Sequence, residues 1–276
     1  MTEIRSERAS ETTAEVQPPE ARPKASWRPL ILLMLAAWVL RVFIVAPFNI
    51  PSDSMLSRLY IGDYLIVAKW PYGYNRFSFP FGIPSFDGRL FPAVPERGDV
   101  VVFRGPAGED VIKRVIGLPG DQVATHRGGL VLNGKAVPRK ALGDFAMPIS
   151  ANSPCRVVPP AMPRIGAGNT CLYPAFRETL PGGRNYVVLD QIDNPMVDDF
   201  APVKVPAGAL FVMGDNRDDS ADSRYTVAMG GMGFVPQDHL IGRALVTFWS
   251  TDGSAVWYKP WTWLSALRPH RIGDGY

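Results

Sequence analysis

Residues 51–67 read Pro-Ser-Asp-Ser-Met-Leu-Ser-Arg-Leu-Tyr-Ile-Gly-Asp-Tyr-Leu-Ile-Val, a polar turn followed by a strand-like run. Ser52 and Ser54 lie one residue apart after Pro51, so the turn presents two hydroxyls directly before the expected strand. The turn also follows a long apolar stretch, which would place both hydroxyls beside a membrane. Serine and aspartate after a proline equally form ordinary turns or cap a short helix. The pattern alone therefore leaves a nucleophilic serine and a structural turn open.

The composition of the 276 residues favours a mostly β protein. The chain has 26 Gly and 27 Pro, which suit short strands joined by many turns. Its 29 Lys and Arg against 26 Asp and Glu give a small, scattered net charge of +3, so no nucleic-acid partner is indicated. The length allows one or two domains with a substantial core.

The amino-terminal part of the chain predicts a membrane anchor. Residues 1–28 are polar and are expected to form a disordered tail, whereas 29–47 are apolar over about the length that a bilayer requires. The only charge in that run, Arg41, lies near its far end, where a long cationic side chain can reach the interface. The run has no polar face, which favours a transmembrane signal anchor over a buried core helix.

The flanking charges predict the orientation of this anchor. Arg22, Lys24 and Arg28 precede the apolar run, so the tail should lie in the cytoplasm and the chain after about residue 48 outside it. A cleavable signal peptide is the competing interpretation, but no small-residue cleavage site follows the run. We therefore predict a single-pass protein of the inner (cytoplasmic) membrane with a periplasmic, extracytoplasmic body.

The body of the chain reads as short apolar strands separated by turns. Buried strands are expected over 100–103, 110–117 and 240–249, and Asn133-Gly134 is typical of a tight hairpin turn. These patterns predict an antiparallel β-sheet core over 48–123 and 210–250 with an inserted β-rich lobe over 124–209, preceded by one transmembrane helix. Residues 251–276 form an aromatic and basic tail suited to a membrane interface. The aromatic residues of 70–95 suit lipid contact and folding back onto the core equally well.

The two cysteines of the chain, Cys155 and Cys171, both fall in the inserted lobe. An oxidising compartment favours a disulfide between them. Closing a loop of about 15 residues would stabilise the fold by about 3 kcal/mol in the chain-entropy model. The alternative is two unpaired thiols in a flexible loop.

The residue inventory excludes several kinds of chemistry. His126, His239 and His270 are scattered, and no H-E-x-x-H or Cys/His pair has metal-ligand spacing, so we expect no metal site. Neither a G-x-S-x-G elbow nor a phosphate-binding loop occurs, and no cofactor is indicated. The polar stretch 213–224 could be a solvated loop or a cation site, although its spacing does not fit an EF-hand.

Serine with lysine remains as a possible catalytic pair. A neutral lysine can activate a serine if the lysine pKa falls from about 10.4 toward 7 or 8, which burial among apolar groups can cause. Lys113 has apolar neighbours on both sides in its expected strand. It could instead protect a sheet edge from aggregation.

Four blocks of the sequence resemble the ordered boxes of bacterial type I signal peptidases, the leader peptidases of the Ser/Lys dyad family. In chain order they are Phe48–Met55 with Ile61–Asp63, Arg97–Phe103, Lys113–Asp121 and Gly214–Arg224. The resemblance covers about residues 30 to 250, behind the expected anchor. It implies a membrane-bound serine endopeptidase that removes signal peptides from exported preproteins by cleaving after Ala-X-Ala.

Carried over position by position, the resemblance implies that Ser54 is the nucleophile and Lys113 the general base. Ser220 would orient the lysine amine, and the Ser54 N–H with the Ser52 hydroxyl would hold the oxyanion. The family's structural ion pairs would fall on Arg114, Asp215, Asp222 and Arg224. Its two shallow pockets for small side chains would be lined by Phe48, Ile50, Met55, Leu59, Leu65, Val102 and Ile112. The Ala-X-Ala end of the signal peptide would bind extended along a strand edge.

Three positions depart from the family pattern. Asp53 stands where glycine is common, Ser57 where proline is common, and Asp219 where asparagine is usual. A carboxylate aimed at the oxyanion would oppose catalysis, so Asp53 is expected to face away. None of the departures removes a catalytic group.

Two other functions remain open at this stage. One is a Ser/Lys peptidase specialised for a single substrate, such as a pilin or conjugation protein. The other is a non-catalytic, membrane-anchored protein that binds exported chains, although the joint presence of Ser54, Lys113 and Ser220 argues against it. The expected partners are signal peptides and membrane lipid, with no nucleic acid, and the oligomeric state is not predicted.

Overall fold

The computed structural model describes residues 26–79, 82–83 and 85–276, and the chain divides into two units, residues 1–37 and 38–276. Helix α1 (Arg28–Val39) is apolar, has no buried residue and continues into a π-helical turn over Leu40–Ile44. Among the described residues, no helix combines the length and apolarity needed to cross a bilayer. The transmembrane helix expected over 29–47 is therefore not found, while most of the expected tail, residues 1–25, lies outside the described residues.

The carboxyl end of the expected anchor belongs to a strand. Val45 takes an extended conformation with φ −135° and ψ 150°, which ends the helical turn. Strand β1 (Val45–Asn49) then pairs antiparallel with β2 (Asp63–Ala68). The apolar run thus contributes to both a helix and a strand. Its last β-branched and proline residues suit the edge strand of a sheet better than a helix.

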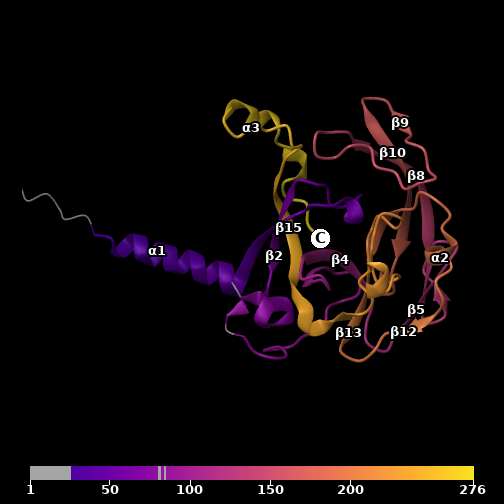
Figure 1. The fold of residues 1–276 in the computed structure, drawn as a ribbon, viewed down its shortest axis with the longest axis horizontal. Helices are drawn as coiled ribbons and strands as arrows, with labels where there is room; N and C mark the ends of the chain where they lie inside the picture. Colours follow the sequence, from indigo (N-terminus) through magenta and orange to yellow (C-terminus); the bar gives the residue numbers. More distant parts are fainter. Residues whose placement is uncertain (1–25, 80–81, 84) are drawn as a thin grey trace, which may run out of the picture. The chain divides into compact units, whose positions relative to one another are not determined.

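The large sheet of the second unit has seven strands in the order β1-β2-β15-β3-β4-β13-β14, all paired antiparallel. Figure 1 shows β15 running beside β2, although the two strands are far apart in sequence. The remaining strands of this sheet are β3 (Val100–Arg104), β4 (Asp110–Gly117), β13 (Ala209–Met213), β14 (Val235–Pro236) and β15 (Leu240–Ser250).

The segment between β4 and β13 forms two further four-stranded sheets. One sheet contains β5 (Gln122–His126), β6 (Gly129–Leu132), β7 (Lys135–Ala136) and β12 (Val203–Lys204). The other contains β8 (Arg139–Pro148), β9 (Ile165–Gly166), β10 (Thr170–Thr179) and β11 (Asn185–Leu189). Asn133 and Gly134 have φ of 50° and 74°, the left-handed values that the expected hairpin turn requires. The β-rich insertion is thus present as antiparallel sheet.

Short helices complete the fold. They are α2 (Pro195–Asp198), α3 (Trp261–Ser265) and 3-10 turns over Asp53–Met55, Trp70–Tyr72, Arg76–Ser78, Val227–Met229, Gln237–His239 and Pro269–Arg271.

The core lies on both faces of the large sheet. All five residues of β13 and four of the five in β3 are buried, which explains their uninterrupted apolar sequences. Separate hydrophobic clusters contain Val101 and Val102, neighbours whose side chains leave β3 in opposite directions. A polar side chain from β4 can therefore be enclosed without reaching the outer surface.

The carboxyl-terminal residues return to the large sheet. Gly275 forms a β-bridge to Val246, and the buried Arg271 pairs with Asp63 at 2.6 Å. Trp257 and Leu264, in contrast, are largely exposed. Residues 251–276 are thus only partly a free tail, because their last turn closes the edge of β15 and neutralises a buried carboxylate.

Candidate active site

Ser54 lies on the 3-10 turn Asp53–Met55 between β1 and β2 and is 7% exposed. Two backbone hydrogen bonds close this turn, from Leu56 N to Asp53 O at 2.9 Å and from Leu59 N to Met55 O at 2.9 Å. Ser52 before it is extended, so the chain changes direction as it enters the turn at Asp53. The turn expected from sequence is therefore present, and it carries the predicted nucleophile.

Lys113 reaches Ser54 from the middle of β4, where it pairs with Val101 of β3. Its side chain is 4% exposed, and its Nζ is hydrogen-bonded to Ser54 Oγ. Burial lowers the pKa of Lys113 to about 8, against the opposing effects of Asp222, Asp215 and Asp219. The lysine is thus enclosed beside the serine rather than placed at a sheet edge.

The polar stretch expected as a loop, Gly214–Arg224, fixes the Ser54 turn from the other side. The Asn216 N–H donates to Ser54 O at 3.1 Å, and Asn216 Nδ2 donates to Asp53 O at 3.2 Å. A Cβ on Gly214 would overlap both Ser220 Oγ and Ser54 O. Only glycine allows this close approach of the loop to the turn.

The two other serines of interest occupy different positions. Ser52 is exposed, and its Oγ lies 3.4 Å from Ser54 Oγ. Ser220 is 3% exposed and lines the same cavity as Lys113. Within the described part of the chain its Oγ has no hydrogen-bond partner, so the expected contact with the Lys113 amine is not formed in this structure.

The expected ion pairs hold the loop in place. Arg114 Nε and Nη2 donate to the two Asp215 oxygens at 2.8 and 2.6 Å, and Arg224 makes a similar pair with Asp222 at 2.9 Å. All four side chains are buried. Asp222 Oδ2 also accepts a 3.0 Å hydrogen bond from Gly214 N. These charge-assisted bonds rigidify the segment that supports the Ser54 turn.

A further buried ion pair, absent from the sequence analysis, ties this loop to the inserted segment. Arg217 pairs with Glu178 of β10, and Tyr186 donates to the same carboxylate at 2.7 Å. Arg217 N also donates to Leu189 O at 2.8 Å. No sequence motif marks Glu178, since alternating strand residues give no sign that a carboxylate will face an arginine 39 residues away.

The residues expected to line the substrate pockets come together. All seven belong to one hydrophobic cluster around the Ser54 turn, with Phe48 half-buried and the others buried: Phe48, Ile50, Met55, Leu59, Leu65, Val102 and Ile112. Six of the seven are at most 4% exposed, so in this structure they form packed core beside the turn.

Ser54 and Lys113 line a charged cavity of about 480 Å³. Its wall includes Asp53 and Asp219, both departures from the family pattern, and Arg156, which sequence reasoning did not single out. Arg156 Nη2 lies 3.1 Å from Asp219 Oδ1. Arg156 comes from the inserted segment directly after Cys155, which forms a disulfide with Cys171.

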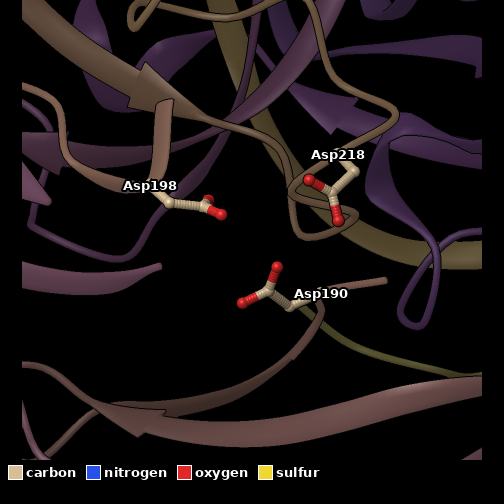
Figure 2. A group of neighbouring side chains, drawn as sticks. All are labelled: Asp190, Asp198 and Asp218. Carbon is tan, nitrogen blue, oxygen red and sulfur yellow. The ribbon is translucent and has the colours of Figure 1, made fainter. Parts of the chain in front are cut away.

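Three more carboxylates gather near this cavity. Figure 2 shows Asp190, Asp198 and Asp218 turned toward one another. One carboxylate oxygen from each lies within 4.8 Å of the other two. Each already has a protein donor: Arg139 pairs with Asp190, Asn194 N donates to Asp198, and backbone N–H groups of 191 and 192 donate to Asp218. These donors leave Asp218 Oδ1 without a hydrogen-bond partner among the described residues, and we assign the group no ligand.

Comparison with known proteins identifies the family. The family described as "Signal peptidase, peptidase S26" matches residues 24–249, most of the chain. The chain belongs to this signal peptidase family. It is 33% identical over 270 residues to signal peptidase I of Rickettsia massiliae (strain Mtu5), covering 90% of this chain and 91% of the relative. Signal peptidase I of Rickettsia akari (strain Hartford) is 34% identical, with the same coverage.

A solved signal peptidase I from Enterococcus faecalis V583 is 28% identical, with a TM-score of 0.28, and the match covers 54% of this chain and 95% of that one. Membership of the signal peptidase family, shown by the sequence matches, makes the chain a serine peptidase that acts in signal-peptide removal. The resemblance found in the four sequence blocks is thus confirmed at the level of family and activity.

Proposed function

We propose that the chain is a membrane-attached endopeptidase that cleaves exported preproteins after Ala-X-Ala, with Ser54 as nucleophile and Lys113 as general base. The hydrogen bond between the buried Lys113 Nζ and Ser54 Oγ carries this assignment. A nucleophile within hydrogen-bond reach of a base is the geometry that serine catalysis requires. The pKa of Lys113, about 8, supports it further, because the amine is substantially neutral near that pH.

The reaction follows from these two groups. Lys113 Nζ takes the Ser54 hydroxyl proton as Oγ attacks the carbonyl carbon before the scissile bond, giving a tetrahedral oxyanion. The Ser54 N–H and the Ser52 hydroxyl stabilise this charge. The C–N bond then breaks, and Lys113 returns the proton to the leaving amine. Lys113 next takes a proton from water, whose oxygen attacks the carbonyl carbon of the acyl-enzyme. The bond from that carbon to Ser54 Oγ breaks, Lys113 returns the proton to Ser54 Oγ, and the signal peptide leaves as a carboxylic acid that loses its proton to solvent.

Two supporting roles belong to the same proposal. Ser220 orients the Lys113 amine once substrate fills the site. Its buried Oγ supports this role, because it lines the same cavity and has no hydrogen-bond partner among the described residues. The hydrophobic cluster around Ile50 and Met55 supplies the pockets for the two small side chains of Ala-X-Ala. Alanine is favoured because a larger side chain would have to displace well-packed atoms.

Attachment to the membrane rests on the exposed apolar surface of α1 and its continuation. Leu32 and Leu33 are 64% and 66% exposed, and no residue of α1 is buried. We propose that this apolar surface attaches the chain to the inner membrane, with the amino terminus in the cytoplasm and the sheets on the periplasmic side. Resistance to alkaline carbonate extraction and protease protection of an amino-terminal tag test this topology. Extraction with soluble proteins would contradict it.

The decisive experiment is cleavage of a preprotein by the full chain in detergent or lipid. Ser54→Ala and Lys113→Ala should each abolish cleavage while circular dichroism remains unchanged. Lys69→Met is the matched control, because Lys69 is also buried but donates to Val42 O and Ser78 O, outside the cavity. It should reduce stability and retain cleavage. Full activity in either dyad variant would refute the assignment.

A panel of unrelated preproteins with Ala-X-Ala sites separates the general peptidase from the alternatives. The proposed enzyme cleaves most of the panel. Cleavage of a single pilin-like substrate would indicate a specialised peptidase, and binding without cleavage would indicate a non-catalytic protein.

A further inference from the structure

The cavity beside the dyad is formally negative when the enzyme is active. Its wall contains the carboxylates Asp53, Asp218 and Asp219 and the cations Lys113 and Arg156. Lys113 must be neutral to act as a base, so Asp53 and Asp219 then outnumber the one guanidinium. Asp218 also lines the wall, but its carboxylate turns toward Asp190 and Asp198. A low-dielectric wall of this kind attracts cationic groups and repels anionic ones.

Asp53 offers an unused acceptor in this cavity. The residue is 3% exposed, and its Oδ1 has no hydrogen-bond partner among the described residues. Burial, and then the charge of Asp219, raise the pKa of Asp53 to about 6, whereas Arg156 lowers it. Near pH 8, where Lys113 becomes neutral, Asp53 is therefore ionised and carries an unsatisfied oxygen.

Arg156 is held firmly at the edge of the same cavity. Its N–H donates to the Tyr173 hydroxyl at 3.2 Å, and that hydroxyl donates to Arg156 O at 2.8 Å. The preceding Cys155 is in a disulfide. The guanidinium pairs with Asp219, yet its side chain is 58% exposed, so it can also meet a bound substrate.

The position of Lys113 tells which part of a substrate enters this cavity. The leaving amine must approach Lys113 Nζ to receive its proton, and Lys113 lines the cavity. The hydrophobic cluster expected to hold the Ala-X-Ala side shares no residue with the cavity wall. The chain that follows the scissile bond therefore extends into the charged cavity.

We propose that Asp53, Asp219 and Arg156 form a leaving-side subsite, which receives the first residues after the scissile bond and favours a cationic group there over an anionic one. This subsite deepens the proposed function and rests on the Ser54–Lys113 assignment. The same carboxylates stabilise the ammonium group of the released amino terminus once the leaving amine has taken a further proton from solvent.

The test is a set of peptides identical through Ala-X-Ala, with Lys, Gln or Glu as the second residue after the cut. The readout is the ratio of kcat/KM for the Lys peptide to that for the Glu peptide. This ratio should exceed one for the full-length enzyme at pH 8 and low salt. Asp53→Asn and Asp219→Asn should each lower it about fivefold, as expected for removing one charge at close range in a partly screened site.

Arg156→Gln should change the ratio in the opposite direction, because it removes the only permanent cation of the wall. Asp144→Asn is the matched control: Asp144 belongs to an exposed pair with Arg164 and does not line the cavity, so the ratio should not change. Added salt should move the wild-type ratio toward one.

A wild-type ratio at or below one, or a ratio unchanged in all three variants, would overturn the subsite while leaving the dyad intact. Absence of cleavage for every peptide would instead refute the proposed function. The variant at the buried Asp53 could fail to fold. Arg156→Gln then still shows in which direction the wall charge changes the kcat/KM ratio, because the Arg156 side chain is more than half exposed.

Discussion

The backbone N–H of Asn216 donates a 3.1 Å hydrogen bond to the carbonyl oxygen of Ser54, so a loop late in the chain fixes the turn that carries the proposed nucleophile. The Asn216 amide adds a second bond to the neighbouring Asp53 carbonyl. Together they satisfy two consecutive backbone acceptors of the turn, and the direction of the Ser54 hydroxyl depends on that support.

Asn216→Ala removes the side-chain bond and keeps the backbone one. We expect unfolding free energy to fall by about 1 kcal/mol and kcat to fall about tenfold, because the Ser54 turn loosens. Asn133→Ala is the control: Asn133 accepts a 2.8 Å hydrogen bond from Gln122 N in a distant hairpin, so it should cost stability without lowering kcat. Equal loss of kcat in both variants would argue against the positioning role.

Gly214→Ala should damage the site more than the fold. The added methyl overlaps Ser220 Oγ and Ser54 O, so the loop must move away from the dyad. We expect cleavage to fall at least tenfold, as in other cases where catalytic groups shift by about 1 Å. Gly275→Ala, whose Cβ would lie 3.6 Å from Leu245 O, should retain activity. A fully active Gly214→Ala enzyme would show that the close packing is dispensable.

The pH dependence of cleavage follows from Lys113. Its burial lowers the pKa to about 8, and only the neutral amine accepts the Ser54 proton, so kcat/KM should fall on the acid side of about pH 8. Asp219 acts in the opposite direction and raises this pKa, so Asp219→Asn should move the acid limb to lower pH. A profile that stays flat down to about pH 5 would contradict a lysine base.

Glu178→Ala should be among the most destabilising substitutions in the inserted sheets. It leaves Arg217 buried without its carboxylate, at a cost of about 3–5 kcal/mol in unfolding free energy. Asp144→Ala, which removes one partner of an exposed pair, should cost at most about 1 kcal/mol. Denaturant unfolding of both variants measures the difference, and similar small losses would show that the Glu178 pair is not needed.

Much of the β fold could be predicted from local patterns. The buried strands β3, β4 and β15 match apolar runs, and Asn133-Gly134 marks its hairpin because both residues tolerate positive φ. Strand order could not be predicted, since β15 enters between β2 and β3 through long-range pairing that no local pattern records. The return of Arg271 to Asp63 was missed for the same reason.

The candidate site likewise contains some residues that local sequence patterns predict and others that they do not. Ser54, Lys113 and the loop 214–224 were expected to meet because each lies in a recognisable block, and the structure brings them together. Arg156 was not expected, because it lies in an irregular segment and reaches the site only through the fold of the insertion. Asp53 was expected to face away from the oxyanion. It lies in the wall of the charged cavity beside Ser54, where the charge of Asp219 raises the pKa of the Asp53 carboxyl.

The hydrogen bond between Asn216 and Ser54 also implies an order in which the site is completed during synthesis. A nascent chain exposes Ser54 and Lys113 long before residues 214–224 have been made, and until that loop arrives the lysine remains in water with its proton attached. An unfinished chain therefore holds both reacting groups but no base. In the proposed mechanism, the base is therefore completed only by residues from the last quarter of the polypeptide.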